Sequence, residues 1–62
     1  MNYLDQIIAY ENGELESQEV IDLFQILIDT GNISDMNRHY RHVAEDLIES
    51  GLCRTAQEKA NA

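Results

Sequence analysis

The sequence predicts an all-α fold, a compact three-helix bundle followed by a polar tail. Three segments, about 2–11, 17–30 and 34–50, carry apolar residues at the spacings of three and four that place them on one face of a helix. No segment of strand length alternates apolar with polar residues, and the chain contains no proline. Each helical segment is followed by a glycine, the residue most common just beyond a helix end.

The first predicted helix, about 2–11, opens at Asn2, which suits the N-cap position. Asp5 lies in the first turn, where the helix dipole favours a negative charge. The pair Asn12-Gly13 accepts the left-handed conformation, so the helix is expected to end there. Four apolar side chains form the stripe that we expect to cover one side of the next helix: Tyr3, Leu4, Ile7 and Ile8.

The second predicted helix, about 17–30, has Ser17 as its expected N-cap and Gly31 as its stop. Most of its circumference is apolar, so it requires cover from the rest of the chain, from a second copy or from a foreign partner. The residues predicted for the core and for self-association are Val20, Leu23, Phe24, Leu27 and Ile28. The polar residues that share its remaining side are Gln18, Asp22, Gln25 and Asp29.

The third predicted helix, about 34–50, starts at Ser34 or Asp35 and stops at Gly51. The apolar residues on its inner face are Met36, Tyr40, Val43, Ala44, Leu47 and Ile48. Residues 1–53 therefore form a single predicted helical domain. Residues 54–62 contain no large apolar side chain, so we expect an exposed tail that is partly disordered or frayed helix.

The net charge of −8 is unevenly distributed along the chain. Residues 1–37 hold eight acids and neither lysine nor arginine, whereas residues 38–62 hold four acids and four basic residues. A negative surface repels nucleic acid and acidic membranes and attracts basic protein surfaces. Solubility alone explains such a charge; the alternative is an acidic face that docks on a basic partner. The candidate partner-binding residues are Glu14, Glu16, Glu19, Asp22 and Asp29.

The sequence offers no arrangement typical of an enzyme, and we expect neither catalysis nor a cofactor. Cys53 follows a helix stop instead of opening a helix, so no helix dipole activates its thiol. Three isolated glycines form no phosphate-binding loop. His39, His42 and Asp46 are a weak candidate metal site, since surface histidines that pair locally with acids are the commoner arrangement. We therefore predict no bound metal.

Nucleic acid and membranes are not expected as partners. The second and third helices loosely resemble a helix-turn-helix whose second helix opens with Arg38 and Arg41. Two arginines in so acidic a chain neutralise too few phosphates for stable binding to DNA. The N-terminus lacks the basic segment of a signal peptide, and no apolar run approaches the roughly 20 residues that cross a bilayer. We expect a cytoplasmic protein.

Three stretches together carry a resemblance that covers about residues 1–53: M-N-Y-L-D-Q-I-I-A-Y-E-N-G-E-L, E-V-I-D-L-F-Q-I-L-I-D-T-G and H-Y-R-H-V-A-E-D-L-I-E-S-G-L-C. They resemble small acidic accessory proteins encoded by tailed bacteriophages. The resemblance implies phage origin and the cytoplasm of an infected bacterium, and it transfers no catalytic or binding residue. Small phage proteins of this class often bind host machinery.

The sequence thus favours a non-enzymatic accessory protein that binds and modulates or inhibits a host protein. The contact would be an acidic helical surface that meets a basic face of that protein, such as a nucleic-acid-handling or defence complex. The alternative is a self-associating structural or adaptor module, for example a homodimer formed through the central apolar helix. A small DNA-binding protein is the least favoured hypothesis.

Overall fold

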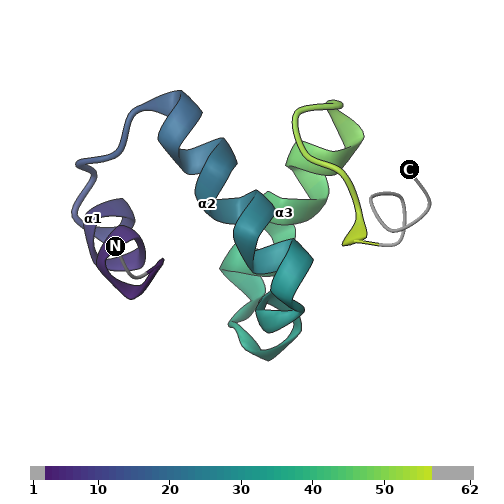
Figure 1. Cartoon of the computed structure of the whole chain (residues 1–62), viewed down its shortest axis with the longest axis horizontal. Helices are drawn as coiled ribbons and strands as arrows, with labels where there is room; N and C mark the ends of the chain where they lie inside the picture. The colour runs from purple at the N-terminus through teal and green to yellow at the C-terminus, as the bar shows by residue number, and fades with distance from the viewer. Residues whose placement is uncertain (1–2, 57–62) are drawn as a thin grey trace.

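Three α-helices and one short 3-10 helix form the molecule in the computed structural model, which describes residues 3–56 (Figure 1). Their order is α1 (Tyr3–Glu11), α2 (Ser17–Thr30), η1 (Asn32–Asp35) and α3 (Arg38–Glu49). No strand occurs in the described part of the chain, so the predicted all-α three-helix bundle is confirmed. The proposed cap Asn2 and the end of the predicted tail, residues 57–62, lie outside the described residues.

Helix α1 ends where the sequence predicts. The N–H of Glu14 donates to the carbonyl of Ala9 at 2.9 Å, and that of Gly13 donates to Tyr10 at 3.0 Å. Gly13 has a φ of 74°, so these two bonds form a Schellman ending around a left-handed glycine.

The face that α1 turns toward the core differs from the predicted stripe. Ile7 and Tyr10 pack against the core, whereas Leu4 and Ile8 are 53% and 59% exposed. The helix is rotated by about one row because the Tyr10 ring packs edge-on against Phe24, with ring centroids 5.4 Å apart. Ile7 and Tyr10 share a row at a spacing of three, which turns Leu4 and Ile8 toward solvent.

Helix α2 has the predicted bounds, but its N-cap is Glu16 and not Ser17. Glu16 and Glu19 form a capping box, in which the Glu16 N–H donates to Oε1 of Glu19 at 2.9 Å. The prediction of Ser17 was wrong because a capping box requires Glu or Gln three residues after the cap. Glu19 stands at that distance from Glu16, whereas Val20 stands there relative to Ser17.

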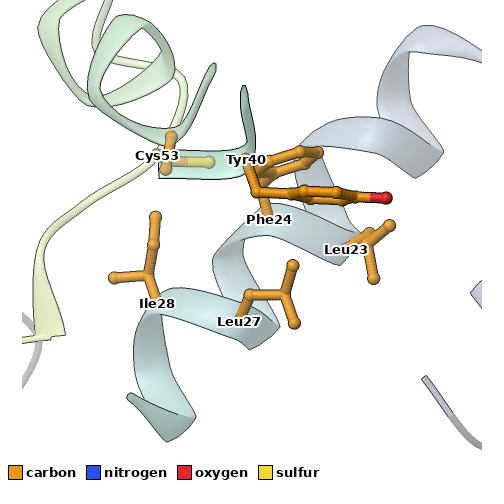
Figure 2. Packing of buried hydrophobic residues seen from close by; sticks show 7 residues of the cluster. Leu23, Phe24, Leu27, Ile28, Tyr40 and Cys53 are labelled. Atoms are coloured by element: carbon orange, nitrogen blue, oxygen red, sulfur yellow. The ribbon is translucent and has the colours of Figure 1, made fainter. Parts of the chain in front are cut away.

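The core is built around α2, which lies between α1 and α3 (Figure 1). Leu23, Phe24 and Leu27 are fully buried and Ile28 is nearly so, which confirms their predicted place in the core; Val20 is only half-buried. Figure 2 shows the Tyr40 ring of α3 lying over Phe24; the two rings stack at 5.9 Å between centroids. Ala44 and Cys53 complete the buried cluster.

The connection between α2 and α3 corrects the predicted start of the third helix. Gly31 ends α2 as expected, with a φ of 80°, but the next residues form η1 and the chain is extended at Met36. Helix α3 starts only at Arg38, because Asn37 acts as its N-cap and accepts the N–H of Tyr40 at 3.3 Å. The residues predicted to open the helix, Ser34 and Asp35, belong to η1.

The segment after α3 returns to the bundle. Gly51 ends α3 as predicted, and together with Leu52 it forms a Schellman ending, in which the Leu52 N–H is bonded to the Leu47 carbonyl at 2.9 Å. Cys53 is then buried against α2, at 2% exposure (Figure 2). Arg54, expected in the free tail, is held by its backbone: its N–H donates to Oε1 of Gln25 and its carbonyl accepts from Nε2, both at 2.9 Å. The polar side chain of Gln25 on α2 thus holds the segment after α3. The spacing of apolar residues in the sequence does not reveal this contact.

Candidate functional site

The first candidate site is the acidic surface at the start of α2, defined here by four residues that are all exposed: Glu14, Glu16, Glu19 and Asp22. None of the four carboxylates lies in an ion pair with a residue of the 3–56 range. The negative charge of this surface is therefore not neutralised by the described part of the chain.

Three carboxylates of the acidic surface are held in place by hydrogen bonds. Glu16 and Glu19 are fixed by their capping box, and Oδ1 of Asp22 accepts from Nε2 of Gln18 at 3.1 Å. Glu14 lies in the turn after α1. These bonds restrict the rotamers of side chains that a surface position leaves otherwise mobile.

Asp29, the fifth predicted residue, does not join the acidic surface. It lies seven residues beyond Asp22, about 10 Å along the helix axis at 1.5 Å per residue. Its Oδ1 accepts from Nε2 of Gln25 at 3.0 Å, beside the docked Arg54 backbone. The polar side of α2 is therefore divided, with an open N-terminal half at Gln18 and Asp22 and a C-terminal half, Gln25 and Asp29, beside which the Arg54 backbone docks.

Cys53, the residue before Arg54, is buried against α2. Its thiol donates to the carbonyl of Ile21 at 3.5 Å. Burial raises the pKa of the Cys53 thiol, and the nearby charges of Asp22 and Asp29 raise it further. A thiol with a raised pKa carries little thiolate at neutral pH, so the environment disfavours nucleophilic chemistry at this position.

The basic residues occupy a different part of the surface. Arg38, Arg41 and His42 line a depression of about 240 Å³ on α3 together with Glu45. Both arginines are exposed and lie in no ion pair with a described residue.

The structure separates His39 from the other two weak metal-ligand candidates, His42 and Asp46. His42 lies near Asp46, with Nε2 and Oδ2 3.6 Å apart, and both side chains are more than 60% exposed. The Nε2 atom of His39 instead lies 2.9 Å from the Tyr10 hydroxyl on α1. Among residues 3–56, no three histidine, cysteine or acidic side chains are grouped closely enough to hold a metal ion.

The second candidate site, absent from the sequence-based prediction, is a groove where α1 meets the start of α3. We name it the α1–α3 groove; it encloses about 440 Å³ and is lined by Tyr10, Glu11, Asn37, His39 and Tyr40. The Tyr40 hydroxyl donates to Oε2 of Glu11 at 2.6 Å. Burial, followed by the hydrogen bond and charge of Glu11, raises the pKa of Tyr40 to about 12.

The ring arrangement of the α1–α3 groove joins residues that are distant in sequence. The centroids of Tyr10 and His39 are 6.1 Å apart, and those of Tyr10 and Tyr40 are 5.6 Å apart. Both hydrogen-bonded pairs across the groove are separated by 29 residues. No local spacing reports such pairs; the only signal in the sequence is the presence of aromatic residues on two helices that must pack together.

The comparisons with known proteins identify a family without assigning an activity. No helix in the described range is both long enough and apolar enough to span a membrane. Neither a curated protein nor a solved structure matches the chain. One family model matches residues 1–61, nearly the whole sequence. The chain therefore belongs to the family described as Domain of unknown function (DUF7417).

Proposed function

We propose that the protein is a non-enzymatic binding protein that docks its acidic surface on a basic face of another protein. The observation that supports this most directly is the state of Glu16, Glu19 and Asp22. Their carboxylates are exposed, oriented by hydrogen bonds and not ion-paired within the described chain. Carboxylates that are already ordered lose less conformational entropy when a partner binds.

The charge of the rest of the molecule reinforces this surface. The first 37 residues contain no lysine or arginine, so α1 and α2 carry acidic side chains and no arginine or lysine of their own. Arg54, whose backbone docks on α2, lies at Gln25 and not at the start of the helix. The field of such acidic side chains accelerates encounters with a basic surface and weakens as salt is added. A basic face that normally binds nucleic acid is a suitable target, because ordered carboxylates can occupy the positions of phosphates.

The proposed setting follows from the sequence resemblance to small acidic proteins of tailed bacteriophages. In this setting the partner is a bacterial host protein, and binding takes place in the cytoplasm of the infected cell. Occupation of a nucleic-acid-binding face would modulate or inhibit the host protein. A nucleic-acid-handling or defence complex presents such a face.

The test removes charge from the acidic surface without removing its hydrogen bonds. The double variant Glu16→Gln/Glu19→Gln retains side-chain oxygens that can accept the capping-box bonds. Its matched control, Glu45→Gln/Glu49→Gln, removes the same charge from exposed positions on α3. Tagged wild type and both variants are used to capture proteins from a bacterial lysate at low salt, with identification by mass spectrometry.

The proposal predicts one bacterial protein that is retained by the wild type and the α3 control and is lost from the α2 variant. Salt should elute it, because the contact is electrostatic. Retention by the α2 variant at the wild-type level, or binding unaffected by salt, would refute the electrostatic docking surface.

Self-association is the second candidate function. The predicted self-association residues Leu23, Phe24 and Leu27 are fully buried inside one chain, so they offer no surface to a second copy. The exposed Ile8 on α1 is instead the position that favours an apolar contact between chains. Sedimentation at micromolar concentration should then show a dimer that Ile8→Glu dissociates; a strict monomer would eliminate this function.

A further inference from the structure

We propose that the α1–α3 groove binds a lysine or arginine side chain of the basic partner. The inference rests on the proposed function for the origin of that side chain, and it adds a specific anchoring site to a general electrostatic attraction. Three features of the groove carry it: a carboxylate with a free acceptor atom, aromatic rings fixed by the core, and the absence of a competing arginine in the lining.

Glu11 supplies the negative charge of the site. The Tyr40 hydroxyl donates to its Oε2 at 2.6 Å and so fixes the carboxylate at the edge of the groove. Among the described residues, none donates a hydrogen bond to Oε1 of Glu11. A lysine ammonium or an arginine guanidinium can therefore donate to Oε1 without displacing Tyr40, and charge-assisted bonds of this kind are the stronger ones.

The aromatic rings suit the same ligand. Tyr10 and His39 line the groove, and cations are attracted to the faces of aromatic rings. Tyr40 is only 4% exposed, so it contributes the hydroxyl that fixes Glu11 and not an open ring face. Tyr10 packs edge-on against the buried Phe24, and Tyr40 stacks on it with an angle of 21° between ring planes. Because Phe24 is fully buried, the core holds both tyrosines in place before any ligand arrives.

The lining favours a cation over an anion. Its one basic group, His39, places Nε2 at 2.9 Å from the Tyr10 hydroxyl. That nitrogen accepts a hydrogen bond from the hydroxyl when the ring is neutral with its own proton on Nδ1. Arg38 and Arg41 line the separate depression on α3. An anion in the groove would meet Glu11 with no arginine beside it.

The test uses small probes in place of the unidentified partner. The full-length chain, labelled with ¹⁵N and ¹³C, is titrated with N-acetyl-arginine amide, with N-acetyl-lysine amide and with N-acetyl-alanine amide as the neutral control. In NMR spectra, we expect saturable chemical-shift changes at the side chains of Tyr10, Glu11, His39 and Tyr40 with one or both cationic probes. The alanine probe should cause none. The tighter cationic probe identifies the side chain that the groove prefers.

Glu11→Gln and Glu49→Gln form a matched pair of variants, because each removes one charge from an exposed position and only Glu11 lines the groove. Gln at position 11 can still accept from Tyr40, and thermal unfolding checks that the fold is retained. We expect Glu11→Gln to weaken probe binding about tenfold, as for loss of a charge-assisted bond, and Glu49→Gln to weaken it less than about twofold.

Three results would overturn the inference. They are chemical-shift changes spread over all the acidic residues, equal weakening of probe binding by both variants, and no chemical-shift change at the groove. The result is independent of partner capture. If the groove binds the cationic probes but Glu16→Gln/Glu19→Gln leaves capture unchanged, the proposed acidic docking surface fails and the groove stands. If capture of the partner requires the acidic surface but the groove does not bind the cationic probes, only the inference about the groove fails.

Discussion

Tyr40 connects the core to the surface at the level of a single side chain. Its ring is buried on Phe24, and its hydroxyl reaches Glu11 on another helix. Burial, together with the hydrogen bond and charge of Glu11, disfavours the phenolate and raises the Tyr40 pKa to about 12. The folded state therefore retains the Tyr40 proton at pH values where an unfolded chain loses it.

The raised pKa predicts a loss of stability in alkali. The free energy of unfolding contains a contribution from Tyr40 that is complete below pH 10, the ordinary pKa of an unfolded tyrosine, and is lost as pH rises through about 12. Urea unfolding followed by circular dichroism from pH 8 to pH 12 measures this loss. Tyr40→Phe should unfold more easily at pH 8 and show a smaller further loss above pH 10. An equal alkaline loss in both proteins would contradict the role given to Tyr40.

Cys53 is expected to be chemically inert in the folded protein. Its side chain is 2% exposed, and its thiol pKa is raised by burial and by Asp22 and Asp29. Both effects lower the amount of accessible thiolate. A thiol reagent should therefore label Cys53 only as fast as the chain opens, with a large increase in rate in denaturant. Labelling as fast as free cysteine under native conditions would contradict the burial.

Some helix ends could be predicted from the local sequence, and others could not. Gly31 and Gly51 were predictable because a glycine at a helix stop is a local signal. The start of α3 was not, since Asn37 competes with two earlier candidate caps and only the packing of η1 selects it. The cap at Glu16 depends on a residue three positions later, a relation that the simple preference for serine overlooks.

The docking of the C-terminal segment on α2 is expected to stabilise the fold. Gln25→Ala removes both bonds to the Arg54 backbone and should lower the free energy of unfolding by about 1–2 kcal/mol. It should also speed labelling of Cys53, which directly precedes Arg54 in the same segment. Gln18→Ala is the matched control, because Gln18 bonds only to Asp22 and should change stability by less than about 0.5 kcal/mol. Equal effects of the two variants would show that the Arg54 contact does not stabilise the fold.

For the whole molecule, the sequence predicts the uneven charge but not the shape on which it is displayed. The acids of residues 1–37 can be counted directly, and their exposure follows from helical periodicity. The α1–α3 groove could not be found in this way, because it arises from the rotation of α1 that directs Tyr10 and Glu11 toward His39 and Tyr40. That rotation is decided by ring packing around Phe24, which no spacing pattern encodes.

The acidic surface is expected to determine the affinity of the protein for its partner. The most direct test measures the affinity of the captured bacterial protein for the wild type and two double variants. Titration calorimetry compares the wild type, Glu16→Gln/Glu19→Gln and Glu45→Gln/Glu49→Gln in the same low-salt buffer. We expect the α2 variant to bind about tenfold more weakly and the α3 control to bind within about twofold of the wild type. Equal dissociation constants for the two double variants would show that net charge alone matters, and would contradict a docking surface at the start of α2.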